Sequence, residues 1–148
     1  MSWFGRLQDL WRSRRTQPPT PPAHLDLGRL GEDAARRELV RGGMKFLLAN
    51  FRSRHGEIDL ILRDADCLVF VEVKTRSSEE WVRPAAAVNA AKRHRLSLTA
   101  EDYLRRLENR RVKSRFDVVE VLVAGGSIAA IRHLVNAFPW DPRRPRRR

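Results

Sequence analysis

The stretch HGEIDLILRDADCLVFVEVKTR, residues 55–76, decides the fold of this 148-residue chain. Two apolar runs, 57–63 and 67–75, read as β-strands joined by a short polar turn at Ala65-Asp66. Residues 68–71 are all apolar, which is typical of a central strand covered on both faces. Charges are costly to bury in such a strand. The acidic residues in this hairpin therefore require an explanation.

The register of the hairpin predicts which of its side chains meet. A two-residue or four-residue turn places Asp59 directly opposite Glu72, and directly opposed side chains share a face at roughly 5 Å between Cβ atoms. Strand alternation adds Lys74 to that face. A three-residue loop would send Asp59 to the other face unless a bulge corrected it, and Ala-Asp is not a favoured pair for a tight turn.

A helix before the hairpin contributes a third acidic residue. The segment 27–41 has apolar residues at helical spacing, with Asp26 as its expected N-cap. Glu32 shares an edge with Ala35 and Leu39, so we expect its side chain to point toward the sheet or its rim. The small residues expected to let this helix approach the sheet closely are Gly28, Gly31, Ala34 and Ala35.

The remaining pattern completes a mixed α/β domain over residues 25–138, in the order αβββαββ. The further elements expected are strands at 45–52, 115–123 and 128–134, a loop at 76–84 and a helix at 88–110. Residues 1–24 read as a basic, amphipathic and Pro-rich tail, and residues 139–148 read as an Arg-rich disordered tail.

The charge of the chain favours polyanionic partners. Of the formal net charge of +12, the two tails carry +3 and +4, so the domain itself retains +5. Such a field attracts nucleic acid first and acidic membrane surfaces second. Residues 1–15 could form a basic helix on a membrane surface, but a frayed tail is favoured because so short a helix is marginal in water.

Cysteine usage and hydropathy bound the compartment. Cys67 is the single cysteine, so an intrachain disulfide is excluded and a Cys/His zinc cluster is disfavoured. No apolar run approaches the roughly 18 residues that span a bilayer, and the first residues lack the features of an ordinary secretory signal. The expected location is the cytoplasm.

Carboxylates gathered on neighbouring strands suit a hard divalent cation, Mg²⁺ or Mn²⁺. Such an ion polarises a phosphoryl oxygen and lowers the pKa of a bound water, and Lys74 could orient that water or stabilise charge on the phosphate. The alternative is an ordinary ion pair between an acid and Lys74 on an exposed sheet face. The apolar run before Glu72 favours the metal, because a covered strand makes a buried acid costly.

Short motifs in the chain resemble the nuclease superfamily with the PD-(D/E)XK signature. They are Glu32 in GRLGEDAARREL, Asp59 in GEIDLI, and Glu72 with Lys74 in FVEVKTR. Together with AAAVNAAKRHRL, RFDVVEV and IRHLVNAF, they occur in the order of the YraN-like bacterial family, whose biochemical role is poorly defined, over about residues 25–138. One departure is that Ile58, not Pro, precedes Asp59.

The resemblance implies a restriction-endonuclease-like core similar to that of archaeal Holliday-junction resolvases. It implies that Asp59 and Glu72 hold Mg²⁺, that Glu32 contributes to the metal shell, and that Lys74 assists attack by water. Resolvase-like enzymes act as dimers, so a homodimer is one arrangement that the resemblance allows.

Three cations near these motifs are candidates for contact with nucleic acid. Arg76 follows Lys74 by two residues, and Lys92 and Arg93 open the second helix, where they could grip phosphates. Lys92 precedes Leu96 by four residues, so it either leans toward the acids or lies on a solvated face.

Other polar residues receive structural interpretations. Trp81 could stack on a base or pack its loop onto the domain. His55 reads as a turn residue, and Asp117 and Glu120 read as sheet-edge or solvent-facing charges.

The sequence favours a metal-dependent endonuclease or phosphodiesterase acting on nucleic acid. DNA is favoured over RNA, and branched DNA is one candidate substrate. The alternative hypothesis is a non-catalytic nucleic-acid-binding protein with a nuclease-like fold, which the positive charge alone would explain.

Overall fold

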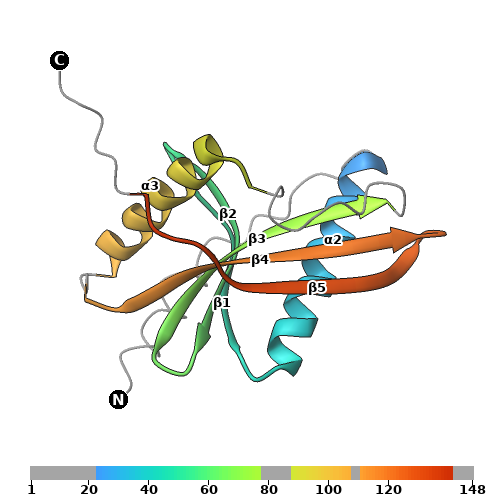
Figure 1. The fold of residues 1–148 in the computed structure, drawn as a ribbon, viewed down its shortest axis with the longest axis horizontal. Helices are drawn as coiled ribbons and strands as arrows, with labels where there is room; N and C mark the ends of the chain where they lie inside the picture. The colour runs from blue at the N-terminus through green and yellow to red at the C-terminus, as the bar shows by residue number, and fades with distance from the viewer. Residues whose placement is uncertain (1–22, 78–87, 108–110, 142–148) are drawn as a thin grey trace, which may run out of the picture.

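Two helices pack on opposite faces of a five-stranded sheet (Figure 1). The computed structural model describes residues 23–77, 88–107 and 111–141. The elements are α2 (Ala23–Arg41), β1 (Lys45–Ser53), β2 (Gly56–Asp64), β3 (Cys67–Ser77), α3 (Ala90–Arg106), β4 (Lys113–Ala124) and β5 (Ser127–Phe138). This order confirms the predicted αβββαββ core and the mixed α/β class.

Strand β3 lies at the centre of the sheet, whose order is β1-β2-β3-β4-β5. It pairs antiparallel with β2 and parallel with β4. Its alternate side chains enter two separate cores: Leu68 and Phe70 pack with α3, whereas Val69 and Val71 pack with α2. The expectation of a central strand covered on both faces is therefore confirmed, and Glu72 continues a run that is fully buried.

Helix α2 approaches β3 most closely at Gly31. A Cβ atom at this position would overlap the side chain of Thr75, so only glycine allows the contact that is seen. The expectation fails at Gly28, where a Cβ atom would meet nothing within 4 Å. Asp26 is not the N-cap, because α2 already begins at Ala23.

Several boundaries differ from the predicted ones because tertiary packing extends or shortens the elements. β5 continues past 134 to Phe138, whose ring stacks on Phe116 with 4.9 Å between centroids. α3 begins later than 88, because Asn89 caps it by accepting a hydrogen bond from Lys92 N at 2.9 Å. β3 runs into the predicted loop, as far as Ser77.

Some predictions concern segments outside the described residues. These are the rest of the loop with Trp81, the segment 1–15 considered for a membrane surface, and most of both tails. Within 23–77, 88–107 and 111–141, no helix combines the length and the apolar character that a membrane span requires.

Candidate active site

The predicted register of the β2–β3 hairpin is confirmed from Asp64↔Cys67 to Leu60↔Val71. The ladder changes at Asp59, the next position. Asp59 Oδ2 accepts a hydrogen bond from Val73 N at 2.7 Å, so the side chain takes the place of a backbone partner. The regular ladder ends at Leu60↔Val71, one position before the predicted pair of Asp59 with Glu72.

A local break in alternation turns Asp59 toward β3. Its neighbours Ile58 and Leu60 are two residues apart, yet they pack in different cores. The facing residue on β1, Asn50, has a φ of 54°, a left-handed conformation that interrupts regular strand geometry. The backbone irregularity at Asn50 therefore lies beside Asp59, where the regular alternation of side chains on β2 is broken.

Glu72 is the buried centre of the candidate site. Its side chain lies on β3 and the residue is only 4 % exposed. One oxygen, Oε1, lies 3.2 Å from Lys74 Nζ and 3.3 Å from Lys92 Nζ. The other, Oε2, is buried and has no hydrogen-bond partner. A buried carboxylate oxygen without a partner is costly, and such exceptions call for a functional explanation.

Asp59 is electrostatically coupled to Glu72. Burial, followed by repulsion from the Glu72 charge, raises the pKa of Asp59 to about 7, against the lowering effect of the Val73 N–H donor. A carboxyl whose ionisation is this unfavourable gains from any cation that can approach both oxygen-bearing groups. Perturbed carboxyl groups of this kind are concentrated at functional sites.

Glu32 faces the same group of acids from α2, half-buried as predicted. Its pKa is raised by burial first and then by the charges of Glu57, Asp33 and Glu72. It also adds to the raised pKa of Asp59. Acids from α2, β2 and β3 thus converge closely enough to repel one another.

The available carboxylates fit a metal ion that takes only one or two protein ligands better than an ion coordinated entirely by the protein. In the described part of the chain, no three His, Cys, Asp or Glu side chains form a group that could hold a metal ion. Mg²⁺, however, is commonly held by one or two carboxylates together with waters and substrate phosphates. Asp59 and Glu72, with the free Oε2 atom, match that arrangement, and Glu32 lies beyond their immediate group.

The predicted cationic residues fall into different environments. Lys92 leans toward the acids, since it contacts Glu72 from the first turn of α3. Arg93 instead donates from Nε to Val88 O at 2.9 Å and lies over the Phe138 ring, so it holds the start of α3 in place. Arg76 points toward Glu120, with 4.0 Å between Arg76 Nε and Glu120 Oε1.

Glu120 was wrongly expected to face solvent. It is 0 % exposed on β4, directly opposite Lys74 in the β3–β4 ladder. Arg132 of β5 approaches its Oε2 at 2.6 and 2.7 Å, whereas Oε1 has no hydrogen-bond partner, like Arg76 Nε facing it. The site thus extends across β4. The signal in the sequence was an acid inside the apolar run VVEV.

Asp117 was also wrongly expected at the surface, and it is 0 % exposed. It accepts hydrogen bonds from Arg115 Nε at 3.0 Å and Asn136 N at 2.9 Å, and lies 2.8 Å from His133 Nε2. These donors hold the pKa of Asp117 below its ordinary value despite burial. Because Asn136 lies on β5, this network ties β5 to β4.

His55 has a structural partner. It lies in the β1–β2 turn, and its Nδ1 is 2.8 Å from Asp102 Oδ2 on α3. This contact agrees with its interpretation as a turn residue.

Comparison with known proteins identifies the family. The model of the uncharacterised protein family UPF0102 matches residues 31–121. The chain belongs to UPF0102. A UPF0102 protein of Rhodococcus opacus (strain B4) is 44% identical over 115 residues, covering 78% of this chain and 98% of that protein. One from Symbiobacterium thermophilum is 45% identical over 112 residues, covering 76% of this chain and 95% of that protein.

Membership in UPF0102 confirms the resemblance to the YraN-like family. The matched region contains all of the acids and amines described above, from Glu32 on α2 to Glu120 on β4. The family is uncharacterised, so its name supplies no chemistry. The chemistry of this UPF0102 chain has to be argued from its own side chains.

Proposed function

We propose that this chain is a divalent-metal-dependent phosphodiesterase that cleaves nucleic acid, with DNA as the first substrate class. The observation that carries the proposal is the Glu72 carboxylate, which is buried between the Nζ atoms of Lys74 and Lys92 and has one oxygen without a partner. Asp59 beside it has a pKa of about 7 because of burial and the Glu72 charge. Two acids and two amines at one point suit a reaction on a phosphate.

Each residue has a distinct role in this proposal. Asp59 and Glu72 would hold the cation, and Glu32 would add negative charge at its rim. When bound, Mg²⁺ or Mn²⁺ neutralises phosphate charge and makes water more acidic. Lys74, about one-third exposed, orients the attacking water and donates to the developing charge. Lys92, in the first turn of α3, positions the Glu72 carboxylate through the same oxygen, Oε1, that Lys74 contacts.

A second candidate function is nucleic-acid binding without cleavage. It is favoured by the same ion pairs, because Lys74 and Lys92 already neutralise Glu72 Oε1 without any metal. A chain that only binds would keep its affinity for nucleic acid when Glu72 is replaced by Gln. The measurement that distinguishes the two functions is whether the chain cleaves a phosphodiester bond of the nucleic acid.

The test is cleavage of labelled four-way DNA junctions, linear duplex, single-stranded DNA and RNA in Mg²⁺ or Mn²⁺. We expect cleavage of at least one DNA substrate, none in EDTA, and a loss of about 10²–10³-fold in Lys74→Ala. Lys113→Ala is the matched control. Lys113 pairs with the exposed Asp66 at 2.7 Å, away from the candidate site, so this variant should cleave normally. Equal cleavage by Lys74→Ala and wild type, or no cleavage of any substrate, would refute catalysis.

A further inference from the structure

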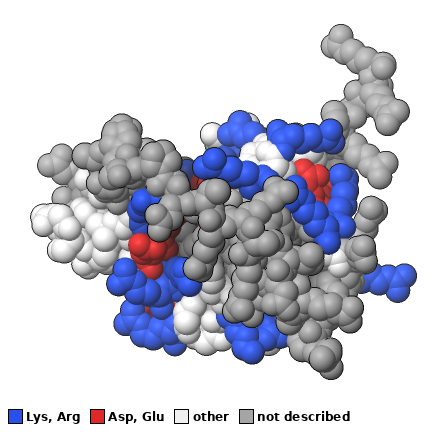
Figure 2. Space-filling view, turned by 180° about the vertical axis from the view of Figure 1, so that it is seen from behind, with Lys and Arg blue, Asp and Glu red and all other residues white. Residues whose placement is uncertain are grey.

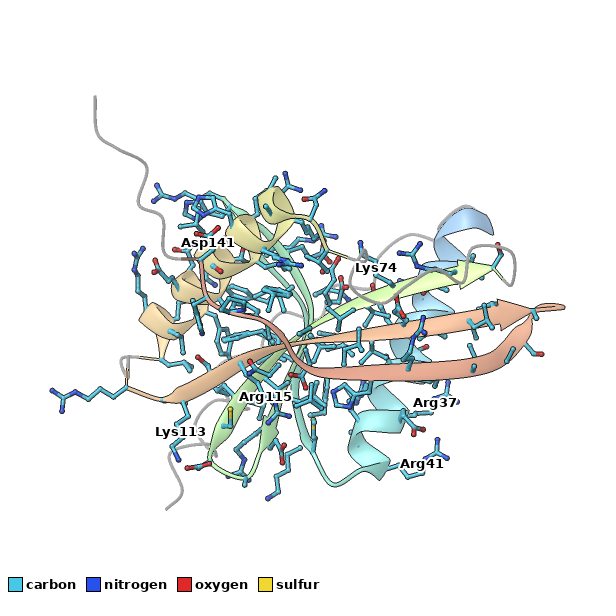
Figure 3. The ribbon with its side chains drawn as sticks, viewed as in Figure 1. Arg37, Arg41, Lys74, Lys113, Arg115 and Asp141 are labelled. Atoms are coloured by element: carbon cyan, nitrogen blue, oxygen red, sulfur yellow. The ribbon has the colours of Figure 1, made fainter. Side chains whose placement is uncertain are left out.

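An open groove lies at the C-terminal end of α2, where the chain turns into β1. Its lining residues are Arg36, Arg37, Val40, Arg41, Met44, Lys45 and Phe46. None of them belongs to the candidate active site. In Figure 3, Arg37 and Arg41 lie beside the C-terminal end of α2 and well away from Lys74. The groove is therefore a surface separate from the acids.

The groove is strongly cationic. Arg37 and Lys45 have no ion-pair or hydrogen-bond partner among the described residues, and both are exposed. Arg41 contacts Glu38 at 2.9 Å on the surface, where such a pair is weak. Among the described residues visible from behind, Lys and Arg cover more of the surface than Asp and Glu (Figure 2). Cations that compensate the dipole of helix α2 belong in its last turn. Arg37 and Lys45 lie outside that turn, so the helix dipole does not account for them.

The floor of the groove is apolar and partly open. Val40 is 44 % exposed and contributes apolar surface to the groove. Arg36 lies over Phe46, with its guanidinium carbon 3.6 Å from the centroid of the ring. A guanidinium held against an aromatic ring offers its other face as a stacking platform for a base. A groove with cations at its edges and an apolar, planar floor suits a strand of nucleic acid whose bases are unpaired.

We propose that this groove binds a single-stranded segment of nucleic acid, with phosphates on Arg37 and Lys45 and a base over Arg36 and Val40. The inference rests on the proposed function for the class of ligand. It adds a contact that does not involve the acids. The groove begins one helical turn beyond Glu32, since Glu32 and Arg36 are four residues apart on α2. An unpaired arm of the substrate can therefore follow α2 away from the acids.

The test measures binding of fluorescent single-stranded and duplex DNA to the full chain in EDTA, where no cleavage takes place. The variant is Arg37→Glu/Lys45→Glu. The matched control is Arg54→Glu/Lys113→Glu, which changes the net charge equally, at an exposed turn and on β4, which β2 and β3 separate from β1. Thermal denaturation verifies that both variants are folded, and Arg37→Gln/Lys45→Gln gives a milder change of charge.

We expect the groove variant to bind single strands about 10-fold more weakly than the control variant, with the neutral pair in between. The slope of log affinity against log salt should fall by about 1.4, corresponding to two lost phosphate contacts on a single strand. Affinity for duplex should change no more than in the control. Equal binding by groove and control variants would overturn the proposal, and so would equal weakening for duplex and single strands.

Two further comparisons distinguish this proposal from a general anion-binding site and from the proposed cleavage activity. If polyglutamate or vesicles containing phosphatidylserine compete with single-stranded DNA as well as unlabelled DNA does, the groove is a general anion site and the proposal fails. Failure of the cleavage test together with a groove-specific loss of binding would refute catalysis and leave the groove assignment standing.

Discussion

At the residue scale, Asp59 shows how local geometry turns a common side chain into an unusual one. Its closeness to Glu72 was predicted from turn length and alternation, although the regular ladder ends one position before the two would pair. Its hydrogen bond from Val73 N and the break in alternation around it were not predicted, because a backbone irregularity such as that at Asn50 leaves no mark in an apolar pattern. Glu120 was misread for a related reason: alternation indicates which face a side chain takes, not what covers that face.

The raised pKa of Asp59 predicts a stability cost that depends on pH. The folded pKa of about 7 lies above the ordinary value, so the cost of ionising Asp59 in the folded state is absent at low pH, grows as the pH rises, and is complete above pH 7. Asp59→Asn keeps an oxygen for Val73 N and removes the charge. In EDTA, urea denaturation should show a gain in unfolding free energy that is about 2–3 kcal/mol larger at pH 8 than at pH 5, because the cost grows over about two pH units.

The control for this prediction is Asp66→Asn. Asp66 lies in the exposed hairpin turn, and its pKa is lowered by Lys113. Its removal should give no gain at pH 8. A gain in Asp59→Asn that is equal at both pH values would show that the pKa of Asp59 is not raised in the folded state.

At the element scale, the sequence predicted the order of helices and strands because hydrophobic periods of two and of 3.6 are properties of neighbouring residues. It failed at element ends, because those depend on partners far away in the chain. β5 reaches Phe138 since the ring stacks on Phe116, and Asp117 is buried since Arg115, His133 and Asn136 surround it. The extra strand length is visible only once β4 and β5 are paired.

Helix α2 offers a matched pair of glycines that tests its packing. Gly31→Ala should lower the unfolding free energy by about 1–3 kcal/mol, because the added Cβ overlaps Thr75 and the helix must shift. Gly28→Ala should raise it by about 0.5–1 kcal/mol, because the new methyl group meets nothing and alanine favours the helix. Chemical denaturation measures both. The same sign for the two variants would contradict the close approach at Gly31.

At the scale of the whole molecule, the candidate site lies where several helices and strands meet. Glu32 comes from α2, Asp59 from β2, Glu72 and Lys74 from β3, and Lys92 from α3, so no element holds it alone. Each of the two helices packs on its own face of the sheet, and β3 is the strand they share. A cation bound by Asp59 and Glu72 would therefore stabilise the folded state as a whole, because the unfolded chain has no such site.

This coupling predicts that metal ions raise the melting temperature. At a concentration of Mn²⁺ about 100-fold above its Kd, the stabilisation should be about 2.7 kcal/mol. For a chain of this size that corresponds to a shift of roughly 5–10 °C. Glu72→Gln should abolish most of the shift, whereas Lys74→Ala should keep or enlarge it, because removing the amine frees Glu72 Oε1 for the metal. Differential scanning calorimetry, with NaCl controls matched in ionic strength, separates the effect of the metal from charge screening.

An equal shift in wild type and Glu72→Gln would place any bound metal elsewhere. A shift lost in Lys74→Ala would show instead that the amine is needed to hold the carboxylates in their binding geometry.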